Sequence, residues 1–105
     1  MENSTVIRMH PNLCVSDIRA SYSTIVESME GSSSIQLAIP TDAIVDLSFL
    51  QIVEAARLQA IEQGKSLSLL EPASGELRRA LDRSGLLTAA TTADRSFWLH
   101  EETAQ

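Results

Sequence analysis

The residues best placed to do chemistry lie around one turn, Asp46-Leu47-Ser48-Phe49. A carboxylate and a hydroxyl at the start of a helix accept hydrogen bonds from its free N–H groups, which contributes about 1 kcal/mol of stability. A phosphate on Ser48 would lie at the electropositive end of that helix and would add up to about two negative charges to the surface. The turn therefore has two interpretations, a helix cap formed by Asp46 and Ser48 or a switch with Ser48 as the candidate phosphoacceptor.

A second group of charged residues lies on the next predicted helix, which carries Arg78, Arg79 and Arg83. Glu76 and Asp82 stand three or four positions from these arginines, a spacing at which side chains pair on a helix surface. The group predicts either a solvated helix face or a contact patch for an acidic partner.

The other reactive residue types do not form a site in the sequence. His10 and His100 are far apart and belong to no ligand-spaced motif, and Cys14 is the only cysteine. Cys14 lies between Leu13 and Val15, so we expect a small buried hydrophobic residue rather than an activated thiol. The sequence therefore predicts no catalytic residue, metal ligand or cofactor, and the protein is not expected to be an enzyme.

Length and charge narrow the choice of partners. A chain of 105 residues fits a single domain, 1–105, with one core. The 14 acidic and 8 basic residues give a formal charge of -6, which repels phosphate backbones, so nucleic acid is not an expected partner. No apolar run has the length of a membrane span and no secretion segment is evident, so we expect a cytoplasmic protein without direct membrane insertion.

Hydrophobic periodicity predicts alternating strands and helices. Strands are expected over 5–9, 35–39 and 66–70, and helices over 16–30, 48–63 and 74–84, while Pro11-Asn12 reads as a turn. Ser16 is the expected N-cap of the first helix, and residues 88–105 fit a strand or a helix equally well. Alternating elements of this length favour an α/β sandwich, in which helices pack on a central, largely parallel β-sheet.

The same periodicity predicts which side chains are buried. On the second helix Ile61 is expected to point inward, and Glu54 and Arg57 outward. The core shared by helices and sheet is expected to contain Leu50, Val53, Ala56, Leu67, Leu69, Leu77 and Leu81.

From Asp46 to Leu87 the chain resembles the STAS family, the fold shared by sulphate-transporter tails and anti-sigma-factor antagonists. In that family an Asp-Ser-Ser-Gly-Leu turn opens a helix that a Gly ends, a short strand and a Pro turn follow, and the next helix closes on Ser-Gly-Leu. Here the chain reads Asp46-Leu47-Ser48-Phe49-Leu50, then Gly64, Glu71-Pro72 and Ser84-Gly85-Leu86. The resemblance covers about 40 residues and implies a STAS-like sandwich.

The resemblance also implies a function. Anti-sigma-factor antagonists are phosphorylated on the Ser directly after the Asp, which here is Leu47, so that Ser48 holds the adjacent position and Phe49 replaces the Gly. Compact STAS proteins found with bacterial chemotaxis genes bind other proteins. The implied function is a regulatory module of signal transduction that docks on a kinase or an anti-sigma factor, with Asp46, Leu47, Ser48, Phe49, Arg78 and Arg79 as partner-binding or switch residues. The alternative is an accessory subunit of an ABC-type lipid transporter that binds the ATPase.

Overall fold

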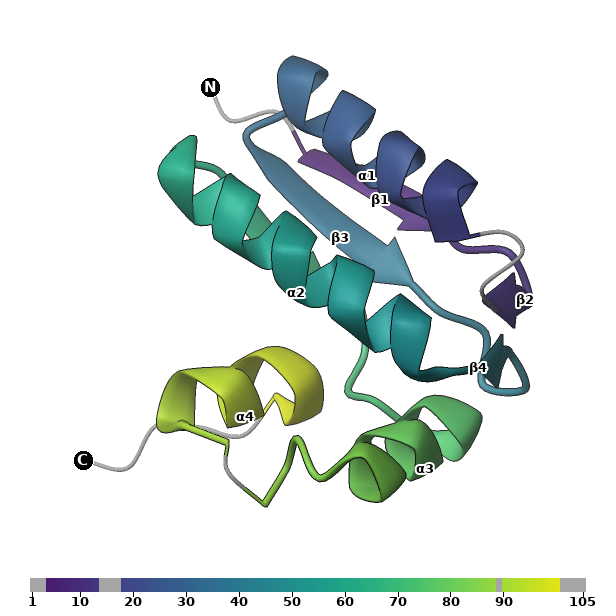
Figure 1. The fold of residues 1–105 in the computed structure, drawn as a ribbon. Helices are drawn as coiled ribbons and strands as arrows, with labels where there is room; N and C mark the ends of the chain where they lie inside the picture. Colours follow the sequence, from purple (N-terminus) through teal and green to yellow (C-terminus); the bar gives the residue numbers. More distant parts are fainter. Residues whose placement is uncertain (1–3, 14–17, 89, 101–105) are drawn as a thin grey trace.

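A computed structural model describes residues 4–13, 18–88 and 90–100 of the chain, and Cys14 and Ser16 lie outside the described residues. The described part alternates short strands with helices (Figure 1). The elements are β1 (Ser4–Arg8), β2 (Asn12–Leu13), α1 (Ile18–Gly31), β3 (Ser34–Ala38), β4 (Ile44–Val45), α2 (Leu47–Glu62), β5 (Ser66–Leu69), α3 (Gly75–Ser84) and α4 (Thr92–Leu99).

The main sheet has three strands in the order β1-β3-β5, and both pairs are parallel. The strands lie side by side in chain order, so the two connecting helices, α1 and α2, cover the same face of the sheet (Figure 1). Ile35, Leu37 and Leu69 alternate with more exposed residues and point toward these helices. The prediction of an α/β fold with a parallel sheet and packed helices is confirmed.

A second, smaller sheet joins β2 to β4, and the sequence analysis did not predict it. Asn12 pairs with Ile44 and Leu13 with Val45, and the Ile44 N–H donates to the Pro11 carbonyl at 2.7 Å. Asn12 is therefore a strand residue and not part of a turn. Two residues are too few to show the alternation by which a strand is recognised.

The predicted core is confirmed at most positions. Leu50, Val53, Ala56, Leu69, Leu77 and Leu81 are buried, and Leu67 is partly buried against them. Ile61 was predicted to point inward but is 66% exposed, whereas the Arg57 side chain is only 16% exposed. Helix α2 carries apolar residues on more than one side, so its periodicity does not define a single buried face.

The helix ends follow from capping chemistry. Asp46 is the N-cap of α2, and Gly64, with φ of 70°, lies one residue beyond the C-cap Gln63. Ser74 is the N-cap of α3, although its side chain makes no capping hydrogen bond, and Gly85 ends that helix with φ of 79°. A positive φ is a conformation that glycine adopts without steric cost, which is why these residues end helices.

The C-terminal part of the described chain forms helix α4. The Thr91 side chain accepts from the Asp94 N–H and the Asp94 carboxylate accepts from the Thr91 N–H, which is a capping box. Phe97 and Trp98 are buried, with ring centroids 5.0 Å apart in an edge-to-face arrangement. The sequence left strand and helix open here, and the structure assigns a helix that packs against β5.

Candidate docking site at the start of helix α2

The turn before α2 is organised by the Asp46 carboxylate. Its Oδ1 atom accepts a hydrogen bond from the Ser48 N–H at 3.1 Å and another from the Ser48 hydroxyl at 2.6 Å. Asp46 has extended backbone angles, as an N-cap residue should. Two hydrogen bonds between Asp46 and Ser48 therefore hold the turn at the start of α2.

Two large apolar side chains lie exposed on either side of Asp46. Leu47, the first residue of α2, is 54% exposed, and Ile44 on β4 is 59% exposed. Ile44 was not among the predicted site residues, although Ala43 and Val45 on either side of it are buried. All three residues are apolar, so the sequence holds no alternation that could have identified Ile44 as the outward-facing residue of this strand.

Phe49 is fully buried, so its predicted role as an exposed docking residue is wrong. It lies on the inner face of α2 together with Val53, Ala56 and Ala60, which follow at helical spacing. The Phe49 side chain therefore fills the core. Only Asp46, Leu47 and Ser48 remain available at the surface of the turn.

Ser48 is half-buried, and its hydroxyl is already used in the bond to Asp46. A phosphate on this oxygen would break that bond and place negative charge beside the carboxylate, while the helix N-terminus would attract it. In the arrangement observed, Ser48 reinforces the cap that Asp46 forms.

Arg78 and Arg79 lie on α3, which packs against both β4 and α2, so the fold brings the two predicted groups of site residues onto neighbouring elements. Both side chains are exposed. Arg78 Nε lies 3.5 Å from Asp82 and Arg79 Nη1 lies 2.7 Å from Glu76, as their spacing predicted. Exposed pairs of this kind add little stability and can be exchanged for contacts with a partner.

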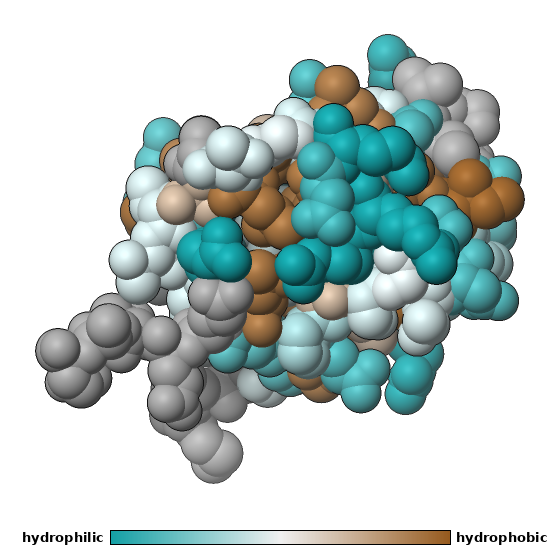
Figure 2. Space-filling model, turned by 90° about the horizontal axis from the view of Figure 1, so that it is seen from below, coloured by the Kyte–Doolittle hydropathy of each residue, from teal (hydrophilic) through white to brown (hydrophobic). Residues whose placement is uncertain are grey.

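On the side of the molecule where α3 and α4 lie, hydrophobic surface is confined to separate patches between hydrophilic ones (Figure 2). A broad apolar plane of the type found at permanent interfaces is not visible in this view. An interface that includes α3 would therefore combine small apolar contacts with polar and charged ones.

The cap gives a first test of this geometry. We expect Asp46→Ala to lower the free energy of unfolding by about 1 kcal/mol, because it removes the acceptor of the Ser48 N–H. Ser48→Ala should cost less, because its N–H still donates to Asp46. Urea denaturation followed by circular dichroism measures both. A larger loss for Ser48→Ala than for Asp46→Ala would contradict the assignment of Asp46 as the cap.

A charged cluster between α2 and α4 was not predicted. Arg57 Nη1 lies 3.1 Å from both Glu54 Oε1 and Asp94 Oδ1, and the guanidinium lies 4.8 Å from the centre of the Phe97 ring. The Trp98 indole N–H donates to Glu54 Oε1 at 3.0 Å. The partners on α4 are about 40 residues from those on α2, so no local pattern links them. The cluster connects α4 to α2.

The capping bond from the Thr91 N–H is the main cause of a lowered Asp94 pKa, and Arg57 lowers it further, while partial burial opposes both. A carboxyl whose pKa is lower in the folded state stabilises the fold above its unfolded pKa of about 3.9, and this contribution is lost as the pH falls through the folded pKa.

The pH dependence of stability tests this cluster. We expect Asp94→Asn to lower stability at pH 7 and to make less difference as the pH falls below about 4, where the wild-type carboxyl is also protonated. Thermal unfolding of both proteins between pH 7 and pH 3 measures the difference. A constant difference across this range would mean that the Asp94 charge is not responsible.

Among residues 4–13, 18–88 and 90–100, no group of three histidine, cysteine or acidic side chains is placed to hold a metal ion. Within the same described ranges, no helix has both the length and the apolar character needed to cross a membrane. No family model matches this chain, no curated protein matches it, and no solved structure matches it.

Proposed function

We propose that this chain is a non-enzymatic, STAS-like module of bacterial signalling that binds a protein partner through the surface at the start of α2. The observation that carries the proposal is the exposure of Leu47 and Ile44, at 54% and 59%, around the polar cap of Asp46 and Ser48. Apolar side chains surrounded by polar groups are typical of protein interfaces, and burying them against a partner gains about 25 cal/mol per Å².

The chemistry of the surface favours a particular kind of partner. Leu47 and Ile44 fit a small apolar depression, and the exposed arginines of the adjacent α3 fit acidic residues around it. A kinase, an anti-sigma factor or a related regulator is the proposed partner. The ATPase of a lipid transporter is the alternative, which the resemblance alone suggests.

Recognition does not require phosphate in this proposal. Leu47, which takes the place of the family's phosphoacceptor, can bury area on a partner but cannot be phosphorylated, and the Ser48 hydroxyl is engaged by Asp46. Mass spectrometry of the protein from its native host provides the check. A phosphate on Ser48 together with loss of partner binding would replace this proposal by kinase control.

The decisive substitution is Leu47→Glu. It should weaken binding by more than about tenfold, because it places a charge where apolar contact is expected. The fold should be unaffected, since Leu47 is exposed and a Glu in the first turn of a helix is favoured by the macrodipole. A tagged pull-down with mass spectrometry identifies the partner, and calorimetry then compares the variants.

Leu58→Glu is the matched control. Leu58 is also an exposed leucine of α2, at 63%, and lies about 16 Å along the helix from Leu47. Its substitution should leave binding close to that of the wild type. If Leu47→Glu bound as well as the wild type, the start of α2 would not be the docking site.

A further inference from the structure

A pocket of about 450 Å³ lies at the carboxyl ends of the three strands of the main sheet. Ala38 pairs with Arg8, and Leu70 follows β5 at the corresponding position, so these three residues form a row across the sheet. In parallel α/β sheets, ligands bind beyond the carboxyl ends of the strands. The pocket is separate from the turn of Asp46 and Ser48, neither of which lines it.

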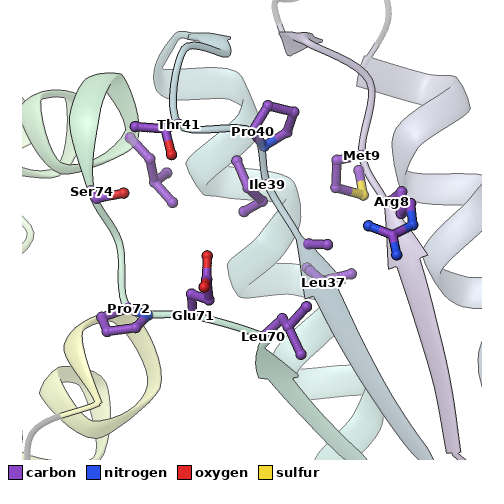
Figure 3. Close-up of a pocket in the computed structure, with 12 residues that line it drawn as sticks. Arg8, Met9, Leu37, Ile39, Pro40, Thr41, Leu70, Glu71, Pro72 and Ser74 are labelled. Atoms are coloured by element: carbon purple, nitrogen blue, oxygen red, sulfur yellow. The ribbon is translucent and has the colours of Figure 1, made fainter.

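Two side chains of opposite charge come from opposite sides of this pocket. Arg8 extends from β1 and Glu71 from the segment after β5, with Leu37 between them (Figure 3). Both residues are exposed, and among the described residues neither has a carboxylate or cationic group within ion-pair distance. β1 and β5 are two strand spacings apart, on the order of 10 Å, so a small molecule can fit between the two charges.

Part of the surface between the charges is apolar, although the lining also contains polar residues such as Thr41 and Ser74. Leu37 and Leu77 are buried beneath the pocket, whereas Leu70 is 40% exposed within it. Ile39 and Pro40 continue this surface on the side of the β3–β4 loop. The lining therefore offers a cation, an anion and an aliphatic contact area.

The walls of the pocket are held by the backbone. The Met9 N–H donates to the Ala38 carbonyl at 2.8 Å and the Leu70 N–H to the Leu37 carbonyl at 2.9 Å, so the strand ends are fixed beyond the regular ladder. Gly75, with φ of +56°, lies so close to the Thr41 carbonyl that a Cβ atom would overlap it. A preformed pocket loses less entropy when it binds a ligand.

We infer that this pocket binds a small zwitterion with an aliphatic side chain, a free amino acid or a dipeptide. The Arg8 guanidinium would receive the carboxylate, for which its planar donors are suited, and Glu71 would receive the ammonium group. The aliphatic side chain would lie on Leu70 and Pro40. This role is independent of the proposed protein docking.

Titration of the ¹⁵N-labelled protein with L-leucine and with leucyl-leucine, followed by NMR, tests the inference. At least one ligand should shift the amide signals of Arg8, Ala38, Leu70 and Ser74 in a saturable manner. Leucinamide, which lacks the carboxylate, and N-acetylleucine, which lacks the ammonium group, should each bind about tenfold more weakly than leucine. Absence of saturable shifts with both zwitterions would overturn the inference.

Variants that remove one charge each test which pocket residue binds the carboxylate of the ligand and which binds its ammonium group. Arg8→Gln should weaken the binding of leucine and of N-acetylleucine, which carry a carboxylate, but not that of leucinamide. Glu71→Gln should weaken the binding of leucine and of leucinamide, which carry an ammonium group, but not that of N-acetylleucine. Both residues are exposed, so the variants should fold, which circular dichroism can verify. Arg83→Gln, at an exposed position outside the pocket, is the control and should bind like the wild type. Equal binding by all three variants would also overturn the inference.

Discussion

Replacing Leu69 by Asp should unfold the protein. Leu69 is 2% exposed, pairs with Leu37 in the parallel ladder and packs beneath the helices that cover the sheet. An aspartate there loses the apolar contact and buries a charge for which the core provides no partner. A domain of this size has about 5 to 10 kcal/mol of stability, and the two losses together should exceed it.

Ser68→Asp is the matched control for this substitution. Ser68 is the preceding residue of β5 and points to the opposite, more open face of the sheet, where a carboxylate stays hydrated. Circular dichroism and thermal melting should show a folded Ser68→Asp protein and an unfolded Leu69→Asp protein. A folded Leu69→Asp variant with an unchanged melting temperature would contradict the register of β5.

The elements that the sequence predicted well are those with local chemical markers. Asp46 and Gly64 mark the two ends of α2 because a capping carboxylate and a glycine at positive φ act within a few residues. The three strands of the main sheet were predicted because each alternates or is bounded by turn residues. Local patterns were enough to define the layers of the fold.

The elements that were missed depend on contacts between distant segments. The β2–β4 pair exists because residues 12 and 44 meet in space, and a pair of two-residue strands leaves no periodic pattern. Arg57 is mostly buried because Asp94 and Phe97 come to it from α4. Its neighbours along α2 do not indicate this, since an arginine at that position would otherwise be solvated.

The candidate site at the start of α2 was only partly predicted, because local chemical markers define its cap but not the exposure of its apolar residues. The cap at Asp46 follows from residue types, whereas the exposure of each apolar residue depends on which face of α2 meets the sheet. Leu47 and Phe49 are two positions apart and therefore about 200° apart around the helix, so a surface that exposes one of them buries the other. Leu47 and Phe49 therefore cannot both contact a partner, and only Leu47 is exposed.

Trp98 is the most deeply buried residue of helix α4, and Trp98→Ala should be strongly destabilising. The indole is 2% exposed, packs edge-on against Phe97 and donates to Glu54, while the Trp98 carbonyl accepts from the Ala73 N–H at 2.8 Å. Replacing a buried tryptophan by alanine leaves a large cavity and costs about 3 to 5 kcal/mol. Much of the stability of the domain would be lost.

Trp98→Phe separates packing from hydrogen bonding. It keeps most of the apolar area and removes the donor to Glu54, which still pairs with Arg57, so the loss should be about 1 kcal/mol. Trp98 is the only tryptophan, so urea unfolding must be followed by circular dichroism rather than by its fluorescence. If Trp98→Ala unfolded at the same urea concentration as Trp98→Phe, the cavity would contribute nothing, and α4 would not be packed on the domain as the structure has it.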